Sequence, residues 1–462
     1  MRRLRLVIVI LLCLVGLAAL GATGFWLYQR ISLQRSLARQ AAEIEAHRAA
    51  QRATPPPPAI AAAPEPGATM AATASRAPDP LPPPYWTGFR GPERDGHYRR
   101  PVLTQWPSTG LRPLWKQPVG GGFASFVAAS GRAFTIEQRG SQEVVAAYDV
   151  LTGRELWTHP WDRIFRSAKA GPRATPTWHD GVVYALGATG ELRALADADG
   201  RQIWRTDILD DANAGNLDWG VAASPLIVDD TVVVLPGGGN GKSVAAYDRR
   251  TGKRVWSALD DDASFSSPVL ATIDGVRQIV VLTASRIVGI TPDRGDLLWE
   301  FPWPYVQNSP QPLILGDRVF VSTSSGGGAV MIQLARDGER FTARELWRTN
   351  RMKNNFSSSV HHDGFIYGLD EFILACIDAA TGELKWKGGR YGYGQLMLAR
   401  GHLIVTTEDG GIAVVRATPE SHQEAVRFTA IEGQTYNHPA IADGILLIRN
   451  SNEMAAFDLR RK

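Results

Sequence analysis

The chain has 462 residues, 44% of them hydrophobic, with 46 glycines and 14 tryptophans. This composition indicates a folded protein rich in turns and large buried side chains, and it excludes a mainly disordered chain. The formal net charge of +4 is small for this length and the basic residues are spread out, so nucleic acid is not indicated as a partner. Cys13 lies in an apolar segment and Cys376 is the only other cysteine, which excludes a disulfide framework.

Residues 6–27 form an uncharged, apolar run of 22 residues that three arginines precede. A run of this length can cross the hydrocarbon core of a membrane as a helix. A cleaved signal peptide is the alternative, because small residues within the run resemble a cleavage site. The run continues beyond them, however, and ends in an aromatic cluster that suits the membrane interface. We expect a signal anchor, with a cytoplasmic N-terminus at 1–5 and a transmembrane helix at 6–28.

The next segments differ in composition from a folded domain. Residues 29–52 are rich in Ala, Arg, Gln and Glu, and we expect them to form a helical stalk. Residues 53–84 are dominated by Pro and Ala, which cannot build a core, so we expect a disordered linker. Because arginines lie on both sides of the span in similar numbers, the positive-inside rule hardly favours one membrane orientation over the other. The folded domain is expected to begin near Tyr85, on a tether.

One pattern recurs from there to the C-terminus. Its clearest copy is 146–157, Ala-Ala-Tyr-Asp-Val-Leu-Thr-Gly-Arg-Glu-Leu-Trp, and close copies lie at 244–256 and 374–386. Each copy is an apolar segment, a turn with Asp and Gly, and a second segment that ends on Trp. The Asp side chain can bond backbone amides ahead of it, and Gly accepts the positive φ of a tight turn. Each copy therefore predicts a β-hairpin.

The aromatic residue that ends each copy recurs at regular intervals along the chain. The eight positions are Trp115, Trp157, Trp204, Trp256, Trp299, Trp347, Trp386 and Phe428. Their separations of 42, 47, 52, 43, 48, 39 and 42 residues suit four-stranded blades, so the repeat predicts an eight-bladed β-propeller. We expect these rings to be structural anchors between blades and not ligand contacts.

A second register supports the same count. Each unit has a short apolar strand that ends in an Asp-Gly-like turn, and alignment on that turn brings eight small or polar residues into register. They are Ser125, Thr175, Ser224, Ser267, Gln311, Ser358, Gln395 and His438. The first strand of each blade lines the central channel of a propeller, so we expect these residues to form a polar ring near one mouth.

The two ends of the repeat region are complementary. The last unit, 438–459, has room for three strands only, while residues 113–119 carry a repeat Trp without a preceding hairpin. Pairing the two closes the ring and removes an exposed sheet edge. The expected fold is all-β: an eight-bladed propeller of four-stranded antiparallel blades at 113–462, closed by its N- and C-terminal strands and preceded by an extension at 85–112.

Two motifs carry a family resemblance. The repeat Ala-x-Asp-x-x-Thr-Gly-x-x-x-Trp resembles the tryptophan-docked repeat of pyrroloquinoline quinone (PQQ)-type propellers, and Phe-Arg-Gly-Pro-x-Arg-Asp-Gly at 89–96 resembles the PQQ-binding-like, or BamB-like, repeat proteins. The resemblance covers about three quarters of the chain and implies the fold and a periplasmic propeller. With the apolar run at 6–27 as its anchor, the protein is expected in the inner membrane. Leu12 stands before Cys13, where a lipoprotein signal needs a small residue, so the outer-membrane lipoprotein form of this family is not expected.

Loops that precede the channel strands hold the candidates for a ligand or partner face. They are Asn216, Asp218, Trp219, Arg351, Lys353, Asn355, Arg390, Tyr391, Tyr393, Tyr436 and His438. If these loops converge, they form a cationic and aromatic funnel that suits an anionic ligand or a peptide carboxylate. The sequence identifies no catalytic residues and no metal site.

The leading hypothesis is a periplasmic binding module, a scaffold for envelope proteins, because no complete catalytic set is visible. A PQQ-dependent dehydrogenase of alcohols or sugars, with PQQ and Ca²⁺ as cofactors, is the alternative. The vicinal cysteines of some quinoprotein dehydrogenases are absent, which weighs against enzymatic function. A sensor of a small envelope ligand is the third hypothesis, in which Arg351 and Arg390 bind the ligand. The sequence does not indicate an oligomeric state.

Overall fold

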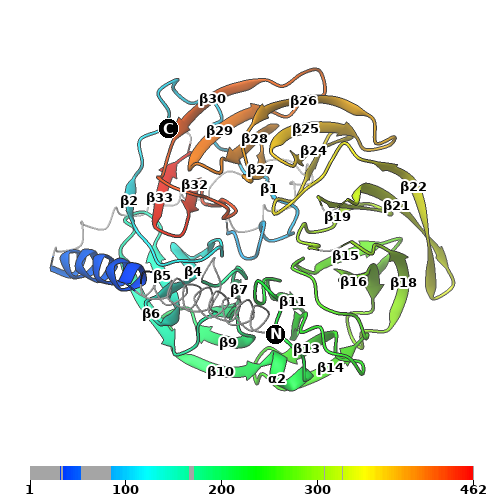
Figure 1. Ribbon diagram of the computed structural model, residues 1–462, viewed down its shortest axis with the longest axis horizontal. Helices are drawn as coiled ribbons and strands as arrows, with labels where there is room; N and C mark the ends of the chain where they lie inside the picture. Colours follow the sequence, from blue (N-terminus) through cyan, green and yellow to red (C-terminus); the bar gives the residue numbers. More distant parts are fainter. Residues whose placement is uncertain are drawn as a thin grey trace, which may run out of the picture.

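The computed structural model describes residues 32, 35–53, 85–165, 171–305, 307–324 and 326–460. In these ranges the strands form eight sheets around a central channel, and each sheet is one blade (Figure 1). The alternation of buried and exposed positions is clearest on the outermost strands, whereas the inner strands are buried on both faces between neighbouring blades. The prediction of an all-β, eight-bladed propeller is confirmed.

The first four blades follow the chain from the channel outward. Blade 1 contains β3 (Val127–Ala129), β4 (Arg132–Arg139), β5 (Gln142–Asp149) and β6 (Glu155–Trp161). Blade 2 contains β7 (Thr177–His179), β8 (Val182–Leu186), β9 (Glu191–Ala196) and β10 (Gln202–Asp207), followed by the short helix α2 (Ile208–Ala212). Blade 3 contains β11 (Leu226–Val228), β12 (Thr231–Val234), β13 (Val244–Asp248) and β14 (Arg254–Ala258). Blade 4 contains β15 (Val269–Ile273), β16 (Val276–Leu282), β17 (Arg286–Ile290) and β18 (Leu297–Pro302).

The remaining blades complete the circle. Blade 5 contains β19 (Leu313–Leu315), β20 (Arg318–Thr323), β21 (Gly328–Asp337) and β22 (Arg340–Thr349). Blade 6 contains β23 (Val360–His362), β24 (Phe365–Asp370), β25 (Ile373–Asp378) and β26 (Leu384–Arg390). Blade 7 contains β27 (Gln395–Ala399), β28 (His402–Thr406), β29 (Gly411–Arg416) and β30 (Glu424–Thr429), with β1 (His97–Tyr98) added in parallel beside β27. Blade 8 contains β31 (Ala440–Ala442), β32 (Ile445–Arg449) and β33 (Glu453–Asp458), and its outer strand is β2 (Trp115–Pro118).

The N-terminal strand β2 closes the propeller by antiparallel pairing with the C-terminal strand β33. The register runs from Trp115 opposite Ala456 to Pro118 opposite Glu453. A further backbone bond from Leu103 N–H to Leu459 O, at 2.7 Å, holds the last residues against the N-terminal extension. Closure therefore pairs an N-terminal with a C-terminal strand as predicted, and it gives blade 8 its fourth strand, so that β33 is not an exposed edge.

The anchor rings lie between each blade and the next. The indole N–H of Trp204 donates to Arg249 O at 2.9 Å, and the ring covers the turn glycine of blade 3, where a Cβ on Gly252 would lie 2.6 Å from it. Equivalent bonds to a carbonyl of the following blade are made by Trp115, Trp157, Trp256, Trp347 and Trp386. Trp299 donates instead to Gln278 of its own blade, because the β21–β22 hairpin is longer and carries its turn beyond this position.

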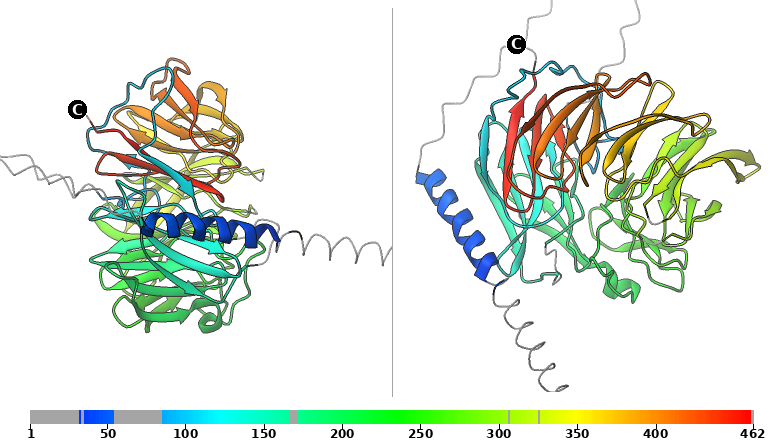
Figure 2. Two further views of the ribbon diagram at one scale, coloured as in Figure 1. Left: turned by 90° about the vertical axis from the view of Figure 1, so that its left-hand side faces the viewer. Right: turned by 45° about the horizontal axis from the view of Figure 1, so that its top comes forward.

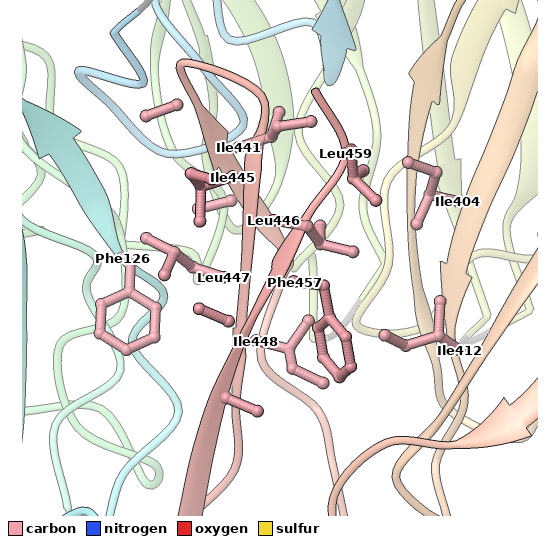
Figure 3. Close-up of a cluster of buried hydrophobic side chains, with 14 of the residues drawn as sticks. Phe126, Ile404, Ile412, Ile441, Ile445, Leu446, Leu447, Ile448, Phe457 and Leu459 are labelled. Atoms are coloured by element: carbon pink, nitrogen blue, oxygen red, sulfur yellow. The ribbon is translucent and has the colours of Figure 1, made fainter. Parts of the chain in front are cut away.

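The core is a series of apolar clusters between blades. One of them, shown in Figure 3, joins blades 7, 8 and 1: Ile404 and Ile412 come from blade 7, and Leu446 and Phe457 come from blade 8. All four side chains are fully buried. Each blade thus buries its faces against its two neighbours, as in other repeat proteins. Closure is important because it gives the first and last blades a neighbour on both sides.

The expected membrane anchor at 6–28 and the expected linker at 53–84 lie outside the described residues, apart from residue 53. Among the described residues no helix is both long and apolar enough to cross a bilayer.

Residues 35–53 form a helix that lies against the propeller instead of projecting as a stalk (Figure 2). The helix straddles the closing seam. Gln40 donates to Val119 O at 3.1 Å and to Ser451 O in blade 8. Arg48 is fully buried and donates to Gln117 Oε1 at 2.8 Å and Pro118 O at 3.0 Å. The polar composition of this segment suggested a solvated helix, but its buried face makes hydrogen bonds to the seam.

Arg48 also reaches blade 1, so a substitution there should release the helix. Its guanidinium lies 3.3 Å from Glu155 Oε2 and 5.0 Å from the ring centre of Tyr148. We expect Arg48→Ala to lower amide protection across residues 35–53 by about tenfold to a hundredfold in hydrogen exchange, since charged hydrogen bonds contribute about 1.5–3 kcal/mol. The matched control is Arg52→Ala, because exposed Arg52 pairs only with Glu45 of the same helix. Equal protection in both variants would contradict the docking.

Candidate functional site

The extension before blade 1 enters the channel and plugs it. This plug, residues 86–98, is held at one end by two backbone bonds of 2.8 Å between Trp86 and Ala128 and at the other by the pairing of β1 with β27. Figure 1 shows β1 near the centre of the ring. Gly96 has φ +76°, and a Cβ there would lie 2.7 Å from the Arg90 guanidinium, so glycine is required at this position.

Two arginines of the plug are buried inside the channel. Arg94 donates to Pro268 O at 3.0 Å and Ser224 O at 3.2 Å, and it also contacts Pro225 O. Arg90 donates to Ser359 O at 2.6 Å. Each guanidinium thus binds backbone carbonyls that precede the inner strands, and together they join the plug to blades on both sides of the channel. The sequence motif at 89–96 has this structural role, which composition and spacing did not reveal.

The predicted polar ring forms a girdle of hydrogen bonds that joins all eight blades. In blade order the bonds are Ser125 N–H to Thr175 Oγ1, Thr175 N–H to Ser224 Oγ, Ser224 N–H to Ser267 Oγ, Ser266 Oγ–H to Pro310 O, Gln311 N–H to Ser358 Oγ, Gln395 Nε2–H to Phe356 O, His438 Nε2 with Leu396 O, and Ser125 Oγ–H to His438 O. Their lengths lie between 2.5 and 3.2 Å. The ring residues therefore hold blades together, which explains why each position needs a short or polar side chain.

Above the girdle lies a pocket of about 430 Å³. Its lining residues are Phe89, Phe123, Arg173, Trp219, Ala222, Ser224, Phe265, Ser267, Gln307, Ser309, Asn355, Phe356, Tyr393, Gln395, Tyr436 and His438. Phe89 belongs to the plug, and its ring centre lies 5.7 Å from that of His438, so the plug forms part of the inner end of the pocket. The pocket opens on the face where the chain enters the inner strands.

An aromatic cluster forms one wall of this pocket. The ring centre of Phe356 lies 5.2 Å from that of Tyr393 and 5.6 Å from that of Tyr436, and Tyr436 stacks on Phe123 at 6.0 Å. Two rings of the lining are open to solvent: Phe356 is 43% exposed, and Trp219, in the loop between α2 and β11, is 39% exposed. Large aromatic rings that are open to solvent at the rim of a concave site are typical of binding sites.

The charge of the lining is one-sided. Arg173 is the cation, held with its guanidinium 5.2 Å from the ring centre of Phe123 and 5.4 Å from that of Phe165. No Asp or Glu is among the residues that line the pocket. Burial, with a contribution from the charge of Arg90, lowers the pKa of His438 to about 3, so this imidazole is neutral at physiological pH.

The structure brings together five of the residues proposed for the ligand or partner face: Trp219, Asn355, Tyr393, Tyr436 and His438. The ring residues Ser224, Ser267 and Gln395 join them, while Ser125, Thr175, Gln311 and Ser358 remain in the girdle outside the pocket. Sequence reasoning missed Phe89, Phe123, Arg173, Phe265 and Phe356. Phe123, Arg173, Phe265 and Phe356 each stand two residues before a predicted ring residue, as Tyr393 and Tyr436 do, so extending the ring register by two positions would have found them. Phe89 belongs to the plug, which lies outside the repeat.

The other proposed face residues have partners elsewhere. Lys353 pairs with Asp370 at 2.6 Å, and Asn216 donates to Ala188 O at 2.9 Å. Tyr391 is buried and donates to Glu424. Arg390 lies over the ring of Phe372 at 5.8 Å. Asp218 and Arg351 are also outside the pocket lining.

The lining does not suit a Ca²⁺-bound quinone. Ca²⁺ takes six to eight oxygen ligands, with carboxylates prominent among them. The described residues that line the pocket include no carboxylate. In the ranges that the structure describes, no group of three or more His, Cys, Asp or Glu side chains could hold a metal ion. The residues present thus do not fit the cofactor that the dehydrogenase hypothesis requires.

Outside the pocket, blade 1 holds a carboxyl group with an unusual titration. Burial, the largest cause, raises the pKa of Glu143 from 4.5 to about 7, although Ala188 N–H donates to it at 3.2 Å. The folded protein keeps a proton that the unfolded chain releases between these values, so stability falls as pH rises from about 4.5 to 7. In Glu143→Gln this pH dependence should be absent. Urea unfolding should show that the free energy of unfolding of the variant, relative to that of the wild type, is about 2 kcal/mol higher at pH 8 than at pH 5. An unchanged difference between the two pH values would contradict this assignment.

Comparison with known proteins agrees with the architecture. The family model described as outer membrane protein assembly factor BamB matches residues 99–231 and 141–388. The chain is 26% identical over 313 residues to the BamB protein of Bordetella pertussis, covering 63% of this chain and 72% of that protein. It is 28% identical over 153 residues to that of Marinobacter adhaerens, a match that spans 32% of this chain and only 34% of the relative.

Solved structures agree in fold. The crystal structure of BamB from Moraxella catarrhalis superposes with a TM-score of 0.53 at 14% identity, covering 75% of this chain and 99% of that one. The quinohemoprotein alcohol dehydrogenase of Comamonas testosteroni superposes with a TM-score of 0.58 at 13% identity, covering 82% and 81%. At these identities the likeness concerns the fold alone. Since the family model covers more than half of the chain, this protein belongs to the BamB-like family of PQQ-type repeat propellers.

Proposed function

We propose that this protein is a membrane-tethered, periplasmic binding module that docks envelope proteins through the propeller face that carries the pocket. The observation that supports it most is the lining itself: aromatic rings open to solvent, one cation and no carboxylate, with no set of groups suited to acid–base or metal catalysis. Such a lining binds and orients a partner. The relatives named for outer membrane protein assembly make a client or component of that process the first partner to seek.

The partner proposal is tested by chemical crosslinking in cells, followed by purification of the full-length chain from the membrane fraction. We expect the same envelope protein to be enriched with the wild type and with Val255→Ala, since Val255 is 55% exposed on the outer strand of blade 3 and far from the pocket lining. Trp219→Ala should reduce its recovery by about tenfold, as expected for an aromatic hot spot. No enriched envelope protein, or equal recovery with both variants, would contradict the proposal.

The proposed tether rests on the uncharged run at 6–27, and its proposed orientation rests on the resemblance to periplasmic propellers, so both need their own test. Cys376 is buried, so a cysteine at exposed Ser421 reports the side of the membrane on which the propeller lies. We expect a membrane-impermeant maleimide to label Ser421→Cys in intact spheroplasts, with the protein in the membrane pellet. Labelling only after lysis would place the propeller in the cytoplasm and overturn the orientation.

A further inference from the structure

Two buried positive charges lie behind the pocket, and the nearest carboxylate, Asp95, does not form an ion pair with either of them. Arg90 and Arg94 are at most 4% exposed, and neither forms an ion pair with a described residue. Burial lowers the pKa of Arg94 to about 9, and it lowers that of Arg90 to about 10 against an opposing effect of Asp95. Both groups therefore stay charged at neutral pH, although carbonyl oxygens only partly replace the water that they lose.

These charges act on the pocket because the two arginines interact with residues that line it. Arg94 binds the carbonyl of Ser224, whose residue lines the pocket, and the charge of Arg90 acts on His438, which also lines it. Arg173 adds a third positive charge at the lining. Among the described residues no Asp or Glu lines the pocket, and Glu408 lies behind the aromatic wall, where it accepts from Tyr436 Oη at 3.0 Å and Tyr393 N–H at 3.1 Å. The end of the pocket at Arg173 therefore favours an anion.

Unused hydrogen-bond groups lie behind the pocket. Nε and Nη1 of Arg90 have no hydrogen-bond partner among the described residues, and neither side-chain atom of Gln311 has one. Both residues are buried and outside the pocket lining, so Arg173 is the charged donor that a ligand in the pocket can contact.

The opposite part of the pocket is suited to an aromatic ring. Phe123, Phe356, Tyr393 and Tyr436 form one continuous wall, and Trp219 and Phe265 complete the lining. A ring inserted here gains edge-to-face contacts with the wall in addition to its apolar burial. The volume of about 430 Å³ is near the lower end of the range for small-ligand pockets and holds about two adjacent side chains.

We infer that the pocket recognises a partner-protein segment in which an acidic side chain lies next to an aromatic one, with the carboxylate at Arg173 and the ring on the aromatic wall. This inference rests on the proposed docking function and names the chemistry of its partner. A peptide suits the site better than a free aromatic acid, because Trp219 and Phe356 remain exposed at the rim and offer apolar surface to the flanking residues of a chain.

The test is isothermal titration calorimetry of the purified full-length chain in detergent with acetylated, amidated hexapeptides. The probe is Gly-Ser-Asp-Phe-Ser-Gly, and its controls carry Asn for Asp or Ala for Phe, so charge and ring are changed separately. We expect each control to bind about tenfold more weakly, as for the loss of one charged hydrogen bond or one buried ring. Arg173→Gln should weaken binding of the Asp-Phe peptide and reduce its advantage over the Asn-Phe peptide, whereas the outer-strand control Val255→Ala should not.

The comparison of Asp with Asn uses the wild-type chain and stays decisive even if Arg173→Gln does not fold. Equal affinities for the Asp-Phe and Asn-Phe peptides, or no binding of any peptide, would overturn the inference. Phenylacetate binding as tightly as the Asp-Phe peptide would overturn it too, because the site would then take small aromatic acids. None of these results affects the crosslinking of an envelope partner, so the proposed docking function would remain. Conversely, peptide binding without any crosslinked envelope partner would support the pocket inference and contradict the docking function.

Discussion

Replacement of Trp204 by alanine is expected to lower the free energy of unfolding by about 3–5 kcal/mol, the usual range for a large ring removed from a core. The ring is 7% exposed and lies between blades 2 and 3, on the turn glycine Gly252, with its N–H bonded to Arg249 O. Its loss leaves a cavity at the boundary between blades and an unpaired carbonyl. Urea unfolding followed by circular dichroism measures the change.

The control for Trp204 is its neighbour Ile203. That side chain is 41% exposed because it points away from the blade boundary on the same strand, β10. Ile203→Ala should change stability by no more than about 0.5 kcal/mol. Similar losses in the two variants would mean that the ring does not act as an anchor between blades.

Glu137→Gln is expected to cost about 3–5 kcal/mol at neutral pH, although it preserves the shape of the side chain. Glu137 is fully buried in blade 1; it accepts from Arg139 Nε at 2.6 Å and from Tyr148 Oη at 3.1 Å. Burial alone would raise its pKa, but the charges of Arg139, Arg449 and Arg48 outweigh burial and lower it. Without the carboxylate, these guanidinium groups are left with less opposite charge in a desolvated site.

Acidification separates this charge effect from a packing effect. A lowered carboxyl pKa stabilises the fold above the ordinary carboxyl pKa, and this stabilisation is lost as pH falls through the lowered value. The difference in the free energy of unfolding between the wild type and Glu137→Gln should therefore become smaller at acidic pH. Glu143→Gln on the adjacent strand is the matched control, with the opposite sign at pH 8, because burial raises the pKa of Glu143. A gap for Glu137 that stays constant with pH would contradict the charge account.

The blade count and the closure could be predicted from the sequence because both depend on local, repeated chemistry. An Asp-x-x-Thr-Gly turn specifies its hairpin through bonds such as Thr152 N–H to Asp149 Oδ1 at 2.8 Å, whatever the rest of the chain does. The Trp that follows needs a neighbouring blade, so its spacing reports the blade length. Trp299 shows the limit of this rule, since a longer hairpin in blade 5 changes its bonding partner without changing its position in the repeat.

The plug and the position of the helix could not be predicted in this way, whereas most of the pocket lining follows the ring register shifted by two residues. Arg90 and Arg94 bind carbonyls more than a hundred residues away, and Arg48 bonds to Gln117, which follows it by 69 residues. Such contacts are single events without a period. Lys353 and Tyr391 show the converse error: their loops do lie near the channel, but a nearby Asp370 and Glu424 take up the polar groups that the sequence assigned to a ligand.

The most direct test of the central claim, that this propeller binds an envelope protein at its pocket face, is site-specific photocrosslinking in living cells. Benzoylphenylalanine replaces Phe356 at the mouth of the pocket in one strain and Ile203 on the outer strand of blade 2 in another. We expect irradiation to give a discrete adduct with an envelope protein from position 356 and none from position 203. Adducts from position 203 alone, or none from position 356, would contradict the claim.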